Sequence, residues 1–441
     1  MTHSDTIFAL SSGQGRAGVA VIRLSGPGAG AAVAALSGAP PGPPRTMVLR
    51  DLRGPDGAQV DRAMVVWFGA PRSVTGEDVV EFHVHGGRAV VAAVLGALAQ
   101  VTGCRPAVAG EFTRRAFDNG KLDLTQVEGL ADLIDAETEG QRRQALRQME
   151  GALGALYDSW RTRLMRALAH LEADIDFPDE DLPGHVPEAL ARDLAGLAGE
   201  MRAHLDDKGI GERTRGGIQV AILGAPNVGK SSILNRLAKR DAAIVAATAG
   251  TTRDVVEVQL DIAGLPVTLA DTAGLRDAGD AVEREGIRRA ERRAAEADVK
   301  IAVFDAQAWP YRDEATAAVV DAATLVVVNK VDLAKTTSDD ASVIGVSAAT
   351  GVGFDDLIAA LKARVGAVAN DAVEAPPLTR LRHRQAVGES LAALTRATAA
   401  VAAELRAEDM RLAARALGRI TGRVDVEDLL DVIFRDFCIG K

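Results

Sequence analysis

The chain has 441 residues, of which 47% are apolar and 25% are charged, and its formal net charge is −10. This length predicts about three domains of roughly 150 residues each, and two distant cysteines exclude a disulfide framework and favour a reducing, cytoplasmic compartment. No signal-peptide pattern opens the chain, and the longest apolar run, residues 89–101, is too short to span a bilayer, so we expect no membrane association. A nucleic-acid partner would need a local positive patch, because the molecule as a whole repels phosphate.

Residues 1–118 alternate short β-rich runs with Gly/Pro turns, which is typical of an α+β domain. The strands expected here are Val19–Leu24, Ala63–Phe68 and Val79–Val84, followed by a helix near 88–101.

Residues 119–215 carry apolar residues at helical spacing, although three prolines between 178 and 187 exclude one continuous helix. Residues 216–375 alternate apolar strands with helices, which predicts a doubly wound parallel sheet of the Ras-like kind, and residues 376–441 are helical again. The helical segments form either separate domains or one bundle into which the α/β domain is inserted. Neither flank is a complete bundle, and insertion into a loop costs little chain entropy, so we predict the insertion. The strands expected in the α/β domain are Ile218–Leu223, Val255–Ile262, Leu265–Leu269, Val299–Phe304, Thr324–Val328 and Ser342–Val346.

A phosphate-binding loop is predicted at "GAPNVGKS", residues 224–231, because it follows a strand and opens a helix. Lys230 would reach the β and γ phosphates, and the Ser231 hydroxyl would coordinate Mg²⁺. The nucleotide-binding candidates of this loop are Asn227, Val228, Gly229, Lys230, Ser231 and Ser232.

Three further motifs at strand ends make the nucleotide a guanine nucleotide. Asn329 and Asp332 of "NKVD" can read the guanine edge, because a carboxylate accepts from both the ring N–H and the exocyclic amine. The candidates in these motifs are Asp271, Thr272, Ala273 and Gly274 of "DTAG", Asn329, Lys330 and Asp332 of "NKVD", and Ser347, Ala348 and Ala349 of "SAA". Between them, Thr251 or Thr252 of "AGTTRD" can complete the Mg²⁺ shell. Four motifs in order exclude a chance set of glycine-rich turns.

The hydrolytic step is less clear from the residues, because Leu275 stands where Ras-like enzymes place a glutamine that orients water. Asn227 could hold a monovalent cation against the phosphates, or it could only stabilise its loop. Glu283 could orient the water after loop movement, or it could be a solvated charge at a helix start.

The motifs "GAPNVGKSSILN", "AGTTRD" and "DTAGLRDAGDAVEREGI", the N-terminal "GRAGVAVIRLSG", the stretch "GEDVVEFHVHGG" and the terminal "FCIGK" together resemble the MnmE/TrmE family. These are GTPases that help to modify the wobble uridine of certain tRNAs. The resemblance covers the whole chain, in the family's order of domains. It implies three parts: a folate-binding and dimerisation domain over 1–118, a discontinuous helical domain over 119–215 and 376–441, and an inserted GTPase domain over 216–375.

The resemblance implies a folate site and a flavoprotein partner. The N-terminal domain is expected to bind 5-formyl- or methylene-tetrahydrofolate as a one-carbon source, and the family pattern falls on Arg23, Glu81, Lys121 and the terminal Lys441. The homodimer is expected to work with the flavin-dependent protein MnmG (GidA). Together they would add an aminomethyl or carboxymethylaminomethyl group at carbon 5 of the uridine.

The resemblance also implies a potassium-dependent GTPase in which Glu283 is the catalytic residue. Potassium would be held by the Asn227 side chain, by backbone carbonyls of Ala246 and Thr248, and by Thr251, and Mg²⁺ by Ser231 with Thr252. Ala246 lacks a polar side chain, so only its carbonyl could serve. Arg253 is a further candidate in the same segment.

The terminal "CIGK" has two interpretations. It could fold back towards the folate or tRNA chemistry, with Phe437 and Ile439 docking it and Gly440 allowing close approach, or it could be a helix end capped by Gly440. Cys438 is either a catalytic thiol or a small buried hydrophobe.

Arginines recur on helix faces near 142–147, 380–384 and 411–419. They could meet tRNA phosphates, although salt-bridged faces are commoner. Two other functions remain open: a regulatory GTPase without folate, and a folate-dependent aminomethyltransferase regulated by GTP without a flavoprotein.

Overall fold

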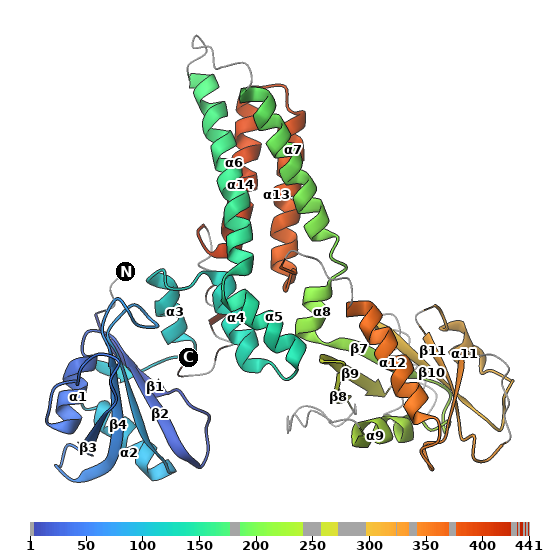
Figure 1. Cartoon of the computed structure of the whole chain (residues 1–441), viewed down its shortest axis with the longest axis horizontal. Helices are drawn as coiled ribbons and strands as arrows, with labels where there is room; N and C mark the ends of the chain where they lie inside the picture. The colour runs from blue at the N-terminus through green and yellow to red at the C-terminus, as the bar shows by residue number, and fades with distance from the viewer. Residues whose placement is uncertain are drawn as a thin grey trace, which may run out of the picture. The chain divides into compact units, whose positions relative to one another are not determined.

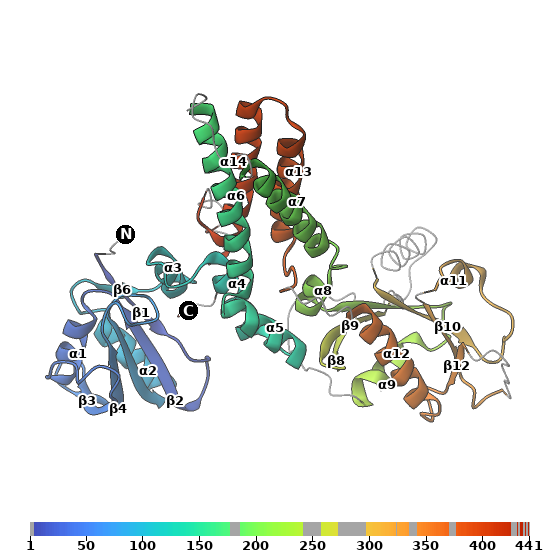
Figure 2. The same cartoon turned by 45° about the horizontal axis from the view of Figure 1, so that its top comes forward.

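The computed structural model describes residues 4–176, 186–240, 257–271, 297–322, 324–334, 342–369 and 376–424, together with Leu430, Ile433, Phe434, Phe437 and Gly440 (Figures 1 and 2). The chain divides into two compact units. The first comprises Met1–Ala131, Met149–Arg161 and Arg415–Lys441, and the second comprises Asp132–Gln148 and Thr162–Ala414. The predicted combination of α+β, helical and α/β parts is confirmed.

The first unit contains a six-stranded sheet in the order β3-β4-β5-β2-β1-β6, which is antiparallel except for the β1–β6 pair. Its strands are β1 (Thr6–Leu10), β2 (Ala17–Ser25), β3 (Val48–Arg53), β4 (Gln59–Phe68), β5 (Val79–Gly86) and β6 (Cys104–Pro106). Its first helices are α1 (Ala29–Ser37), α2 (Arg88–Leu98) and α3 (Glu111–Asp118).

Side chains that alternate along the strands of this sheet form its two faces. Ile22 and Leu24 of β2 and Phe82 of β5 are buried with residues of α1 and α2 in one core. On the opposite face, Phe112 of α3 packs with Ile7 in a smaller cluster. Side chains alternate between the two faces of a strand. Arg23 of β2 and Glu81 and His83 of β5, which alternate with the core residues, therefore lie on the α3 face, away from α1 and α2.

The second unit contains a six-stranded sheet in the order β12-β11-β10-β7-β9-β8. Its strands are β7 (Ile218–Leu223), β8 (Glu257–Ile262), β9 (Leu265–Asp271), β10 (Val299–Asp305), β11 (Thr324–Asn329) and β12 (Val343–Val346). The helices α9 (Lys230–Arg240) and α12 (Phe354–Ala369) contribute to one core against it, and the segment that contains α11 (Glu314–Ala318) packs on the residues of the other face.

The sheet of the second unit is parallel as predicted, except that β8 pairs antiparallel with β9. The expectation of an all-parallel sheet is wrong at this edge. Only Ala263 and Gly264 connect the two strands, both with positive φ (57° and 81°). A two-residue connection of this kind can form only a hairpin, since a parallel crossover needs a dozen residues or more.

Helices from both sides of the α/β segment pack together in the second unit. In both views α7 and α13 lie side by side (Figures 1 and 2). Arg163 of α6 pairs with Asp193 of α7 at 2.7 Å, and the Ser390 hydroxyl of α13 donates to the Ala413 carbonyl of α14 at 3.0 Å. The helices outside the sheets are α4 (Leu124–Asp135), α5 (Glu139–Met149), α6 (Ala152–Asp176), α7 (Val186–Leu205), α8 (Ile210–Gly216), α13 (Leu381–Ala399) and α14 (Ala403–Thr421).

The chain enters and leaves the α/β segment at one place. Gly211 of the incoming α8 lies so close to the Leu378 carbonyl of the outgoing segment that a Cβ would clash. The Leu378 N–H donates to Asp207 at 3.2 Å, and Arg384 pairs with Asp207 at 2.6 Å. The segment that enters the α/β part and the segment that leaves it therefore lie close together, as an inserted segment requires.

Among the described helices, none is both long enough and apolar enough to cross a bilayer.

Candidate functional site

The predicted phosphate loop joins β7 to α9. Its bends need special residues: Asn227 and Gly229 have φ of 64° and 97°, and a Cβ on Gly224 would clash with the Val303 carbonyl of β10. Lys230, only 6% exposed, donates its ammonium to the carbonyls of Gly224 and Ala225 at 2.7 and 2.8 Å. The loop thus holds a cation at the N-terminus of a helix, which is a favourable site for phosphate. Ser231 and Ser232 are exposed in the first turn of α9.

Asn329 connects the phosphate loop to the "SAA" loop. Its side-chain amide donates to the Val228 carbonyl at 2.8 Å, and its side-chain oxygen accepts from the Ala348 N–H at 3.0 Å. The residue is 1% exposed and lies against Gly229, where any side chain would clash. The structure therefore uses Asn329 to hold two loops together, and it leaves the exposed Asp332 as the side chain of this motif that can meet a guanine edge.

The "SAA" loop and Lys330 are fixed by side chains from neighbouring elements. The Arg236 guanidinium of α9 donates to the carbonyls of Ala348, Ala349 and Thr350 at 2.8 to 3.1 Å. The Ser347 hydroxyl is buried and accepts from the Thr350 N–H. Lys330 donates to Asp305 at 2.7 Å. Burial opposes ionisation of this carboxyl, but the bond and charge of Lys330 and the bond from the Gln307 N–H together outweigh burial and lower the pKa of Asp305.

Most of the residues predicted to bind metal or to take part in hydrolysis lie outside the described residues. Asp271 ends β9, where its backbone lies beside Ile222, just before the phosphate loop. The side chain of Asp271 and the whole of Thr272, Ala273, Gly274, Ala246, Thr248, Thr251, Thr252, Arg253 and Glu283 lie outside the described residues. Asn227 is exposed, and its side chain makes no hydrogen bond to another described residue.

The first unit holds a second candidate site on the α3 face of its sheet. Arg23 of β2 and Glu81 of β5 are directly opposed in the antiparallel register. The guanidinium donates from Nε and Nη2 to Glu81 Oε1 at 2.9 and 2.8 Å, and it lies 5.9 Å from the Phe112 ring centroid. His83 Nε2 is 3.4 Å from the other oxygen of Glu81. Among the described residues, no group of three or more His, Cys, Asp or Glu side chains could hold a metal ion.

Arg23, Glu81 and Lys121 line one cavity of about 420 Å³. Its other lining residues are Arg45, Phe68, Arg72, Ser73, Val74 and Val79. Lys121 follows α3 through Gly120, whose φ is 65°, and its N–H donates to the Ala116 carbonyl at 2.8 Å. Its alkyl chain lies over Gly76, which has no side chain to block it. Three of the four residues expected to bind folate, which are 40 or more positions apart in sequence, are thus brought together.

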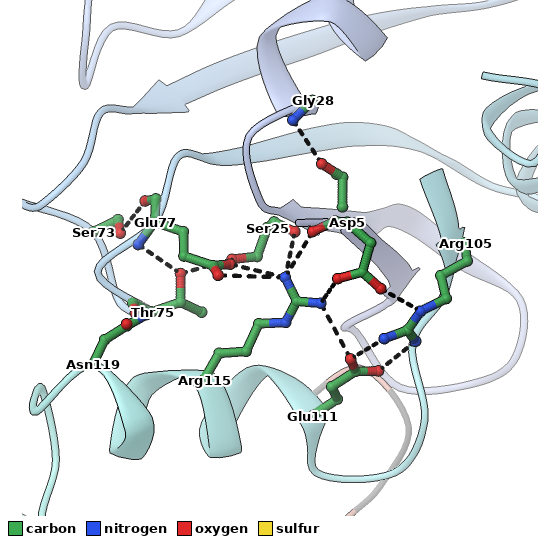
Figure 3. A network of polar contacts seen from close by, with 11 residues as sticks. Asp5, Ser25, Gly28, Ser73, Thr75, Glu77, Arg105, Glu111, Arg115 and Asn119 are labelled. Carbon is green, nitrogen blue, oxygen red and sulfur yellow. Dashed lines mark hydrogen bonds and ion pairs between the residues drawn. The ribbon is translucent and has the colours of Figure 1, made fainter. Parts of the chain in front are cut away.

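A buried polar network supports the wall of this cavity (Figure 3). Arg115 of α3 is fully buried and donates to Glu77 at 3.1 Å, to Asp5 at 2.8 Å and to Glu111 at 3.2 Å. Glu77 accepts a hydrogen bond from the Ser25 hydroxyl at 2.7 Å, and its carbonyl accepts one from Ser73. Arg115 and Glu77 therefore determine where the 73–77 segment, which lines the cavity, can lie.

The C-terminal segment docks on the first unit. Phe434 and Phe437 are buried with Leu124 and Val127, and the Ser11 hydroxyl donates to the Gly440 carbonyl at 2.8 Å. Gly440 has a φ of 103° and lies against the Leu10 carbonyl, where a Cβ would clash. Phe437 and Gly440 therefore have the docking and close-approach roles expected of them. Cys438, Ile439 and Lys441 lie outside the described residues.

Four residues at the cavity or behind it were not predicted: Arg45, Arg72, Glu77 and Arg115. Their partners lie up to 110 positions away, as for Arg115 and Asp5, so no local pattern could have identified them. The arginine-rich helix faces are largely occupied, since Arg142, Arg380, Arg384 and Arg411 all form ion pairs.

The phosphate loop, the "NKVD" loop and the "SAA" loop, assembled at one edge of a largely parallel sheet, define a GTP-binding protein of the P-loop GTPase class. Two family models match the chain: "GTP-binding protein TrmE N-terminus" over residues 6–121 and "MnmE helical domain" over residues 124–438. The chain belongs to the MnmE/TrmE family.

Curated relatives span the whole chain. The protein from Parvibaculum lavamentivorans, named tRNA modification GTPase MnmE, is 61% identical over 99% of this chain and 100% of its own length. The protein of the same name from Paramagnetospirillum magneticum is 56% identical, with the same coverage. Among solved structures, Era of Aquifex aeolicus bound to GDP and aluminium fluoride is 25% identical, covering 40% of this chain and 66% of its own, with a TM-score of 0.26.

Proposed function

We propose that the chain is a potassium-dependent GTPase of tRNA modification. As a homodimer acting with a flavin-dependent MnmG (GidA) partner, it would use a folate one-carbon unit to install an aminomethyl or carboxymethylaminomethyl group at carbon 5 of the wobble uridine of certain tRNAs. The names of the full-length relatives support the tRNA substrate and the GTPase activity. Cytoplasmic localisation, without membrane association, stays part of this proposal.

The convergence of Arg23, Glu81 and Lys121 on one cavity carries the folate part of the proposal. The carboxylate of Glu81 accepts hydrogen bonds and the guanidinium of Arg23 donates them, so the pair suits a ring edge that offers both donors and acceptors. The pterin ring of a 5-formyl- or methylene-tetrahydrofolate has such an edge. Lys441 follows Gly440, which contacts Leu10; the neighbouring Ala9 is paired with Arg23. Gly440 is thus held at the strand that pairs with Arg23, and the proposed site includes Lys441 as the next residue in the sequence.

The GTPase part of the proposal assigns a role to each group at the phosphate loop. Lys230 leaves its two loop carbonyls and turns to the β and γ phosphates when GTP binds. Ser231 and Thr252 would hold Mg²⁺, which would neutralise phosphate charge. Asn227, with Ala246, Thr248 and Thr251, would hold K⁺, and Glu283 would orient the attacking water. Asp332 accepts from the guanine edge, while Asn329 keeps its two loops in place.

Calorimetric titration with 5-formyltetrahydrofolate tests the folate site. The intact chain should bind it, and a chain lacking 438–441 should bind it more weakly if the terminal motif reaches the cavity. Unchanged binding on truncation would keep the folate site and return "CIGK" to a structural role. Failure of the intact chain to bind would leave a regulatory GTPase as the better explanation.

Hydrolysis of GTP in KCl, compared with NaCl at equal ionic strength, tests the cation. We expect faster turnover in KCl and loss of the difference in Asn227→Ala. A rate that is equal in both salts would contradict the potassium site without affecting the folate site. Modification of a tRNA only when the flavoprotein is added would exclude an aminomethyltransferase that acts without this partner.

A further inference from the structure

The cavity of the first unit is strongly positive in a strongly negative molecule. Four cations line it, Arg23, Arg45, Arg72 and Lys121, against the single carboxylate of Glu81. The chain as a whole carries a net charge of −10. Concentration of positive charge in a hollow of such a molecule indicates a ligand with more than one negative group.

Three of these cations pair with no acidic side chain in the part of the chain that the structure describes. Arg23 is paired with Glu81, but within the described part of the chain Arg45, Arg72 and Lys121 form no ion pair. By contrast, Arg105 and Arg163 each bind two carboxylates. The cavity therefore keeps positive charge available for a ligand.

Contacts within the protein fix the position of the Arg45 side chain on the cavity wall. Its φ is 60°, its N–H donates to the Trp67 carbonyl at 2.7 Å, and its guanidinium lies 5.6 Å from the Phe68 ring centroid. One guanidinium nitrogen donates to the Arg72 carbonyl at 2.6 Å. Because a guanidinium has five N–H donors, the remaining ones can bind a carboxylate.

The strand register separates these arginines from the Arg23–Glu81 pair. Glu81 lies opposite Val66 in β4, whereas Phe68, under Arg45, lies opposite Val79. Two residues along a strand correspond to about 7 Å. The cavity thus offers a nearly neutral donor–acceptor pair in its sheet floor and an unneutralised cationic group at the strand ends.

We propose that Arg45 and Arg72 bind the carboxylates of the γ-linked glutamate tail of a folate and so select polyglutamylated folates over the monoglutamate. This inference rests on the folate site proposed above. The Arg23–Glu81 pair would take the ring, and each additional glutamate would bring one more carboxylate to the cationic group. The preference should weaken as ionic strength rises, because these arginines are exposed.

Titration of the full-length protein with the mono- and triglutamate forms of 5-formyltetrahydrofolate, at low and high salt, tests the inference. At low salt we expect the triglutamate to bind about fivefold more tightly, a ratio that exposed charge pairs can supply. Arg72→Gln should remove most of this ratio, and Arg45→Gln should reduce it. Arg53→Gln, an exposed arginine of β3 that does not line the cavity, is the matched control and should keep it.

The outcomes distinguish the tail from the ring. Equal affinity for the two ligands in the native protein, or a ratio that survives in Arg72→Gln, would overturn the inference while leaving the folate site intact. Loss of tRNA binding in Arg72→Gln with an unchanged ratio would overturn it in favour of RNA phosphate. If neither ligand binds, the proposed folate site fails and the inference fails with it.

Discussion

Asn329 holds two loops together, although its motif suggested that it recognises the guanine base directly. It is buried, and both polar atoms of its side chain bind the backbone of the two loops beside it. Asp332, three residues on, is exposed. Two polar residues of one four-residue motif thus divide the work: one shapes the pocket and the other is free to meet the base.

We expect Asn329→Ala to lower both stability and nucleotide affinity. The Val228 carbonyl and the Ala348 N–H would lose their partner, which should reduce the free energy of unfolding by about 1–3 kcal/mol. Affinity for a fluorescent GDP should fall by at least about tenfold as the loops separate. Asp332→Asn is the control, since it should weaken GDP binding without changing the urea midpoint. An unchanged midpoint in Asn329→Ala would show that the bridge does not stabilise the loops.

Arg115 should be the most sensitive residue of the first unit. It is fully buried and pairs with three carboxylates; Arg115→Met leaves Glu77 without its cation, and Asp5 and Glu111 keep only Arg105. We expect a loss of about 3–5 kcal/mol in the unfolding free energy of this unit, measured by hydrogen exchange in β1 and β2. Arg62→Met, which breaks an exposed pair with Asp51, should change it by less than about 1 kcal/mol. Similar effects of the two substitutions would contradict the role given to the network.

At the scale of elements, the network joins Asp5, just before β1, to β6 and α3 and should make the first unit sensitive to acid. Burial raises the pKa values of Asp5 and Glu111, but bonds from Arg105 and the charge of Arg115 outweigh it, so both pKa values lie below the ordinary 3.8 and 4.5. Carboxyls with depressed pKa values stabilise the fold above their unfolded pKa, and this stability is lost as the pH falls. Exchange protection of β1 should therefore decline below about pH 4.5 and less steeply in Glu111→Gln.

The helical layer of the second unit should respond in a higher pH range. Burial lowers the pKa of His204, at the end of α7, to about 4, with smaller contributions from Arg384 and His383 and opposition from Asp207. The unfolded chain binds the proton more readily, so stability is complete above about pH 6.5 and falls towards pH 4, by about 3 kcal/mol. Protection of α7 measured across this range should decline in the native protein and stay level in His204→Gln. An equal decline in both would assign it to another group.

The elements that the sequence predicted are those whose patterns are local. Continuous apolar runs identified β7, β10 and β11 within one residue, because strands covered on both faces need no polar alternation. The strands that were missed, β1, β3 and β6, are short or polar, so their local patterns are weak, and β6 pairs only with the distant β1. The nucleotide motifs could be read from adjacent residues, whereas the support of Glu77 by Arg115 exists only after α3 has packed on the sheet.

At the scale of the whole molecule, the α/β segment should be separable. Its core consists of residues between Ile218 and Val365, and its two ends meet where Gly211 touches Leu378. We expect a fragment of residues 217–370 to fold and to bind GDP within about threefold of the intact chain, because both loops held by Asn329 are inside it. Circular dichroism and GDP titration of the fragment test this. An unfolded fragment would indicate that the sheet depends on the helices that flank it.

The α/β segment lies between helices that pack on each other, and this order determines when each part of the chain can fold during synthesis. The sheet between Ile218 and Val365 can close as soon as its own residues leave the ribosome. Helix α7, which ends at Leu205, must wait for α13, which begins at Leu381. At ordinary elongation rates this delay is on the order of tens of seconds, during which the apolar face of α7 has no cover. Phe437 and Gly440 are synthesised later than all of these elements, so the N-terminal sheet is made first but receives the contacts of these two residues late.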